Sequence, residues 1–190
     1  MPEECVIPIH RPKPTEMIFF FTCGIIMSVS ITFFITALLD PSISGLAAPW
    51  PAVISLVLFA PFIEEFSKIF PLYYRHGETQ RSIVNLAIMV GLGFAIVELL
   101  EYVLLLGTPL VFRLPGLFFH PATAAISAYG IATKRPVPFY FLAVSLHFSA
   151  NFLSIVNPLP LSLSILVIGL TVFLAYTFYG RTKEKMIAHD

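Results

Sequence analysis

The stretch that decides the fold runs from Trp50 to Tyr74 and reads WPAVISLVLFAPFIEEFSKIFPLYY. It is long enough to cross a membrane, because a helix needs about 20 apolar residues to span a hydrocarbon layer of roughly 30 Å. It nevertheless carries Glu64, Glu65 and Lys68. Charged side chains in a membrane helix are costly, so they usually face the interior of a helix bundle and mark a functional site. The stretch therefore predicts a membrane helix bundle with a polar interior.

The rest of the 190-residue chain has the composition of a membrane protein. Apolar residues make up 57% of it and charged residues 12%, with a mean hydropathy of +0.88, which excludes an ordinary soluble domain. We predict an all-α, polytopic transmembrane bundle of about six spans, forming one domain over residues 17–180 between irregular tails at 1–16 and 181–190. The five further spans are Met17 to Leu39, Ser82 to Leu106, Leu110 to Thr133, Val137 to Val156 and Leu159 to Tyr179.

The basic residues predict the orientation of this bundle. Lys and Arg accumulate in cytoplasmic loops, and the six spans place nine of the eleven basic residues on one side: Arg11, Lys13, Arg75, Arg81, Lys134, Arg135, Arg181, Lys183 and Lys185. We therefore expect both termini in the cytoplasm and a multi-pass protein of the cell membrane, with the lipid bilayer as its surroundings. The formal net charge is zero, so we expect no nucleic-acid partner. Arg113 lies toward the opposite face, where we interpret it as an interfacial residue that snorkels outward.

Polar residues in four successive predicted spans lie at similar depth. Counted from the cytoplasmic ends at about 1.5 Å per residue, their depths are about 15 to 25 Å, so they form one layer. Helical spacing puts Glu64 on one face with Lys68, which we expect to neutralise it, and His147 on one face with Asn151. The candidate catalytic residues in this layer are Glu64, Glu65, Glu98, His120, His147 and Asn151, with Lys68 and Arg113 in support.

Charge balance leaves two chemical interpretations of this layer. Three carboxylates face one lysine, so either at least one carboxyl is protonated or a cation lies among them. In the first case a glutamate acts as general base on a water that His120 orients, while His147 and Asn151 donate to the developing oxyanion. In the second case one divalent ion such as Zn²⁺ is held by some of His120, His147, Glu65 and Glu98, and a remaining glutamate is the base.

The order of these residues is similar to that in a known protease family. The pattern Glu64-Glu65-x-x-Lys68, Phe94-x-x-x-Glu98, a histidine in the next span and His147-x-x-x-Asn151 resembles the PrsW-type intramembrane proteases. These are related to the wider group of CAAX prenyl endopeptidases and bacteriocin-processing or immunity proteins (CPBP/Abi). The likeness covers roughly residues 60 to 155. Glutamate rather than histidine four residues after Phe94 favours the PrsW branch.

The resemblance implies cleavage of a membrane-anchored protein substrate, for example a single-span protein similar to an anti-sigma factor. It also implies that Glu64, Glu65, His120 and His147 are essential. Some classify the wider group as metallopeptidases and others as glutamate-dependent, so both mechanisms stay open. Two other functions fit buried glutamates and histidines: a proton- or cation-coupled transporter, and a non-catalytic membrane scaffold of the same family.

Overall fold

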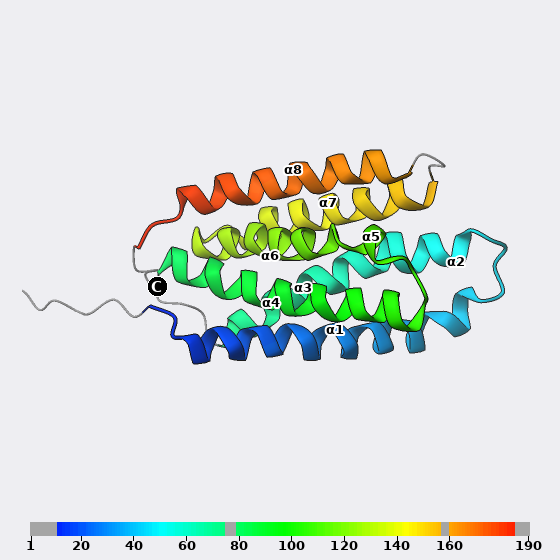
Figure 1. The fold of residues 1–190 in the computed structure, drawn as a ribbon, viewed down its shortest axis with the longest axis horizontal. Helices are drawn as coiled ribbons and strands as arrows, with labels where there is room; N and C mark the ends of the chain where they lie inside the picture. The colour runs from blue at the N-terminus through cyan, green and yellow to red at the C-terminus, as the bar shows by residue number, and fades with distance from the viewer. Residues whose placement is uncertain (1–10, 75–78, 157–159, 185–190) are drawn as a thin grey trace, which may run out of the picture.

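The computed structural model describes residues 11–74, 79–156 and 160–184, and over these residues the chain is a helical bundle without a β-strand (Figure 1). This confirms the predicted all-α fold. Residues 1–10 and 185–190 of the predicted tails, Arg75, and residues 157–159, where the last predicted span begins, lie outside the described residues.

The helices follow one another along the chain with short connections. Two segments, η1 and η2, are π-helical, which means that their backbone hydrogen bonds skip one residue more than in an α-helix. The elements are α1 (Pro14–Ile43), α2 (Trp50–Ala52), η1 (Val53–Phe59), α3 (Ala60–Tyr74), α4 (Gln80–Leu100), η2 (Glu101–Leu105), α5 (Leu110–Arg113), α6 (Gly116–Ala132), α7 (Pro136–Val156) and α8 (Pro160–Arg181).

Four helices in the described part of the chain are long and apolar enough to cross a membrane. They are Pro14–Ile43, Gln80–Leu105, Pro136–Ile155 and Leu163–Arg181. The other two predicted spans are helical but different in character. The predicted span 50–74 is built from α2, η1 and α3 and includes three charged residues, while the predicted span 110–133 is divided by a turn at Leu114 and Pro115. Pro115 has no N–H to continue the helical hydrogen bonds of α5.

Helix α6 is the centre of the bundle, packed among α3, α4, α7 and α8. Eleven of its 17 residues are buried, and most of these are small. Small side chains let helix backbones approach closely inside a membrane bundle. One close approach is at Gly91 of α4, where an added Cβ would lie 2.6 Å from the carbonyl oxygen of His120. The small residues therefore bring α4 directly against the part of α6 that carries His120.

One end of the bundle is tied together by Arg81 at the start of α4. Its Nη2 donates to the carbonyl oxygen of Thr182, just after α8, at 2.6 Å, and its guanidinium lies 4.7 Å from the ring centroid of Tyr179. Figure 1 shows that α1 begins at this same end. Three of the predicted cytoplasmic positions, Lys13, Arg81 and Arg181, therefore lie at one end of the molecule.

Candidate active site

The first part of the site is a buried ion pair within α3. Lys68 and Glu65 have side chains that are 0% exposed, and Nζ of Lys68 lies 2.6 Å from Oε1 of Glu65. The same Nζ donates to Oγ1 of Thr123 on α6 at 3.3 Å and lies 4.9 Å from the ring centroid of Phe94 on α4. We expected Lys68 to neutralise Glu64, and this is wrong. The ion pair of Lys68 is with Glu65, three residues before it on the same helix. Lys68 thereby connects α3, α4 and α6.

Glu65 also orients His147 of α7. Its Oε1 lies 2.7 Å from Nδ1 of this histidine. A carboxylate accepts hydrogen bonds, so this contact places the ring proton on Nδ1 and leaves the lone pair on Nε2. Nε2 in turn lies 3.8 Å from Oε2 of Glu64, which is too long for a hydrogen bond. The unprotonated nitrogen of His147 thus faces the carboxylate of Glu64.

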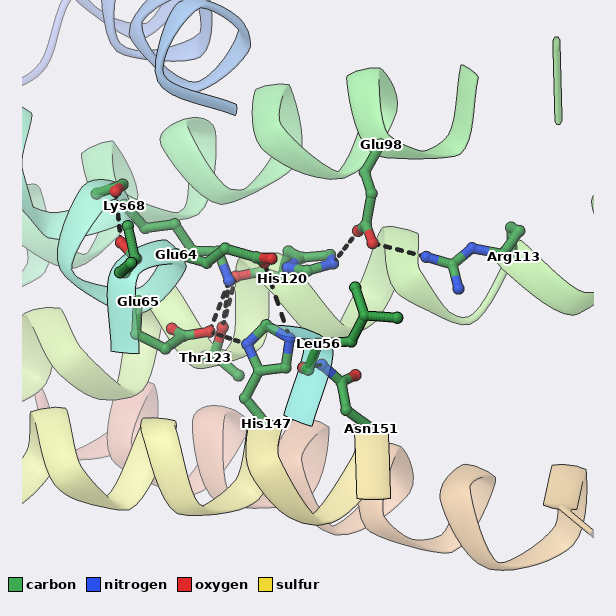
Figure 2. Close-up of polar contacts among 12 residues, drawn as sticks. Leu56, Glu64, Glu65, Lys68, Glu98, Arg113, His120, Thr123, His147 and Asn151 are labelled. Carbon is green, nitrogen blue, oxygen red and sulfur yellow. Dashed lines mark hydrogen bonds and ion pairs between the residues drawn. The ribbon is translucent and has the colours of Figure 1, made fainter. Parts of the chain in front are cut away.

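The second histidine is held in the same way from the other side. Nε2 of His120 is in contact with Oε2 of Glu98, whose Oε1 lies 2.6 Å from Nη2 of Arg113 (Figure 2). The guanidinium of Arg113 lies over the ring of Tyr102, 3.5 Å from its centroid. The interpretation of Arg113 as a residue that snorkels outward is therefore wrong, because the side chain turns inward to Glu98. The contact with Glu98 leaves Nδ1 of His120 as the unprotonated nitrogen.

The two imidazole rings and Glu64 converge. The ring centroids of His120 and His147 are 5.5 Å apart, and both rings are in edge contact with Phe119. Figure 2 shows the side chain of Glu64 extending toward both histidines. Glu64 Oε2 and His120 Nδ1 are buried and have no hydrogen-bond partner among the described residues. The predicted polar layer therefore has a centre, and the groups at that centre are Glu64, His120 and His147.

Asn151 is placed differently from the histidines. One turn after His147 on α7, its Nδ2 donates to the backbone carbonyl oxygen of Leu56 at 2.8 Å. Leu56 lies in the π-helical segment η1, whose hydrogen-bond pattern differs from that of the flanking α-helices. An Nδ2 group carries two N–H bonds, so the bond to Leu56 uses one of them. Asn151 also lines the larger of the two cavities at the site.

Two cavities reach this centre. The larger, of about 610 Å³, is lined by residues of α4, η2 and α5 to α8 and includes both histidines. The smaller, of about 210 Å³, is lined by residues of α1, η1, α3, α4 and η2 and includes Glu64. Glu98 and Tyr102 line both cavities. The reacting groups are therefore accessible from two sides.

A protein-family model agrees with the order of these residues along the chain. The model of the PrsW family intramembrane metalloproteases matches residues 12–178. The chain belongs to this family. It is thus an intramembrane protease by family, in agreement with the apolar helices of the bundle. Comparisons with curated proteins and with solved structures find no match to this chain.

The name of the PrsW family implies a metal, and the donor atoms at the centre of the site fit one in kind. The unpartnered atoms there are an imidazole nitrogen of His120 and a carboxylate oxygen of Glu64, and Nε2 of His147 faces the same point. Two histidines and one glutamate form a known ligand set of catalytic zinc. Each histidine also has a carboxylate on its other nitrogen, as metal-binding histidines usually do. As they stand, no three His, Cys, Asp or Glu side chains of the described residues are gathered closely enough to form a metal site.

The contributors to the site that were not predicted from the sequence include Tyr102, Thr123 and the carbonyl of Leu56. Tyr102 follows Glu98 by four residues, so the helical spacing was a usable signal for it. Thr123 lies among small apolar residues of α6 and looks like a packing residue in the sequence. The role of Leu56 depends on a backbone carbonyl, which every residue has, so no side-chain pattern could indicate it.

Proposed function

We propose that this protein hydrolyses a peptide bond of a membrane-anchored protein with a water that Glu64 activates. The observation that carries the proposal is the distribution of charges. Glu65 is paired with Lys68 and Glu98 with Arg113, which leaves Glu64 as the one carboxylate of the three without a Lys or Arg ion pair among the described residues. Its Oε2 lies 3.8 Å from Nε2 of His147, and Figure 2 shows its side chain extending toward His120 as well. A carboxylate in this position is suited to take a proton.

In the proposed reaction, Glu64 accepts a proton from water while the water oxygen bonds to the carbonyl carbon of the substrate. The tetrahedral intermediate then collapses, the C–N bond breaks, and the proton passes to the leaving nitrogen. The products are a carboxyl group and an amine. Asn151 and Arg113 line the larger cavity and are donors available to the oxyanion. Glu65 and Glu98 position the two histidines.

We further propose that His120 and His147 would hold a divalent ion such as Zn²⁺ next to Glu64, which would remain the general base. An ion bound there would make a coordinated water more acidic and so supply the nucleophile. Elemental analysis of the purified protein, with activity measured after chelation and after adding Zn²⁺ back, tests this proposal. Stoichiometric metal that is lost from a His120→Ala/His147→Ala variant supports it. Full activity in metal-free protein contradicts it and supports Glu64 acting alone.

The topology that we propose has six membrane crossings and both termini in the cytoplasm. The four long apolar helices supply four crossings, and the helical stretch 50–74 and α6 supply two more that bundle neighbours partly shield from lipid. Arg81 lies at the start of α4 and Thr182 follows α8. Their contact at one end of the bundle therefore agrees with an even number of crossings between them. The basic residues at this end favour the cytoplasmic side of the cell membrane. Reporter fusions at each terminus and at Gly107 test the orientation.

The decisive experiment for the proposed function uses purified protein in proteoliposomes with tagged single-span proteins, including one similar to an anti-sigma factor. We expect cleavage by the wild-type protein and loss of at least 10³-fold in rate for Glu64→Gln, His120→Ala and His147→Ala. Glu16→Gln, on α1 and outside the site, is the matched carboxylate control and should cleave at the wild-type rate. Ion flux without cleavage would indicate a transporter, and substrate binding without cleavage would indicate a scaffold. Either result would contradict the peptidase proposal.

A further inference from the structure

The two cavities at the site differ in size and in chemistry. The larger contains apolar side chains such as Phe112 and Ile168 next to the donors Arg113 and Asn151, and Glu98 is the one carboxylate among its lining residues. The smaller is acidic, because Glu64, Glu98 and Glu101 are all among its ten lining residues. A mixed apolar and donor lining suits a peptide, whose backbone carbonyls need donors and whose side chains need apolar contacts. A small acidic lining suits water, whose hydrogens the carboxylates accept.

The volumes of the two cavities also suit a peptide in the larger and water in the smaller. One turn of an α-helix with its side chains, about 11 Å wide and 5.4 Å long, fills roughly 500 Å³. The larger cavity of about 610 Å³ therefore has room for about one turn of peptide. The smaller cavity of about 210 Å³ holds roughly seven waters at about 30 Å³ each.

The histidines and Glu64 line different cavities, which agrees with separate roles for the two cavities. His120 and His147 line the larger cavity but not the smaller, whereas Glu64 lines the smaller but not the larger. The wall between them is formed by Glu98 and Tyr102, which line both. A carbonyl entering on the histidine side would thus meet a water delivered on the Glu64 side.

We propose that the larger cavity binds a locally unwound peptide segment of the substrate, and that the attacking water reaches Glu64 through the smaller, acidic cavity. This inference rests on the proposed peptidase function. Unwinding is required because an intact helix keeps its carbonyls in internal hydrogen bonds, so that they are not free to accept from the donors Arg113 and Asn151. Irregular backbone is tolerated at membrane depth where it is enclosed by protein or faces water, and this cavity offers both.

The substrate half of the inference is tested with Ile165→Trp on α8. Ile165 lines the larger cavity and is 43% exposed, so an indole can enter the cavity without disrupting a packed core. We expect KM to rise at least tenfold while kcat stays within threefold. The matched control is Leu166→Trp, because Leu166 is the next residue, is 67% exposed and lines neither cavity. It should leave both constants unchanged.

The water half is tested with Ser55→Trp in η1. Ser55 lines the smaller cavity and is partly buried, so an indole there would occupy much of the space. We expect kcat to fall at least tenfold with KM within twofold, because the substrate still binds but the water is displaced. Leu58→Trp is the control on the same segment, 45% exposed and lining neither cavity. Thermal unfolding in detergent verifies that the variants are folded.

A measurement without substrate separates this inference from the proposed function. In a chain with Cys5 and Cys23 replaced, Ser55→Cys should react with a water-soluble, membrane-impermeant cationic thiol reagent at least tenfold faster than Leu58→Cys. Equal labelling rates, or a KM effect at Ser55 with a kcat effect at Ile165, would overturn the two-cavity assignment while leaving the protease proposal standing. Absence of any cleavage by the wild-type protein would overturn the protease proposal and the peptide site with it.

Discussion

Replacing Lys68 with methionine should destabilise the bundle strongly, because it leaves a carboxylate buried without its cation. Nζ of Lys68 is 0% exposed, lies 2.6 Å from Oε1 of Glu65 and also contacts Thr123 and the ring of Phe94. Methionine is similar in length to lysine and apolar, so the packing against Phe94 is largely kept. The loss is therefore mainly electrostatic.

The expected loss in the free energy of unfolding depends on the hydrogen bond that Glu65 retains in the variant. Removing one partner of a buried ion pair typically costs about 3–5 kcal/mol. Oε1 of Glu65 retains the hydrogen bond from Nδ1 of His147, so we take the lower end of this range. We expect the free energy of unfolding to fall by about 3 kcal/mol, or roughly 150-fold in the equilibrium constant.

The assay is reversible unfolding in mixed micelles with increasing SDS, followed by circular dichroism. The double variant Lys68→Met/Glu65→Gln is the internal control, since it removes both charges and should lose no more than about 1 kcal/mol. A single variant that is as stable as the wild type would refute the reasoning. So would a double variant whose loss equals the sum of the two single losses, because the pair would then not be coupled.

Three further predictions concern the geometry around the two histidines. Arg113→Lys should lower kcat about tenfold with little change in KM, because lysine keeps the charge beside Glu98 but not the planar contact with Tyr102; an unchanged kcat in steady-state cleavage would contradict this. Gly91→Ala should lower activity at least 100-fold, because its Cβ would lie 2.6 Å from the carbonyl oxygen of His120 and 2.7 Å from Cα of Pro121 and so displace α6, whereas Gly169→Ala, with nothing within 4 Å of its Cβ, should be silent in the same assay. Glu64→Gln should raise the midpoint of thermal unfolding by a few degrees while abolishing cleavage; a lower midpoint would show that Glu64 supports the fold.

Much of the site could be predicted from the sequence because charged residues within apolar runs are rare. Glu64, Glu98 and His120 stand out among apolar neighbours, and counting residues at a constant helical rise was enough to place them at one depth. The structure brings these residues together from α3, α4 and α6. Depth is a local property of each helix, so it needs no knowledge of how the helices pack.

The pairing of the charges could not be predicted in the same way. Lys68 can reach back three or four residues along its helix, and the sequence does not say which of Glu64 and Glu65 faces it. The inward turn of Arg113 depends on the short helix α5 and on Tyr102 at the start of η2, both consequences of irregular backbone. The π-helical segments and the division at Pro115 likewise depend on tertiary packing, which the period of the apolar residues does not report.

The pairings in the structure form two series, each of a cation, a carboxylate and a histidine, and both series end at the centre of the site. Lys68 pairs with Glu65, which holds His147, and Arg113 pairs with Glu98, which holds His120. In each series the cation neutralises the carboxylate, and the carboxylate orients the histidine ring so that its free nitrogen faces inward. Each series is thus balanced in charge, and the unbalanced charge at the centre is that of Glu64. The energetic cost of burying charge is thus concentrated on the one carboxylate whose reactivity the proposed chemistry needs, and the residues that support it are those whose loss should cost stability as well as rate.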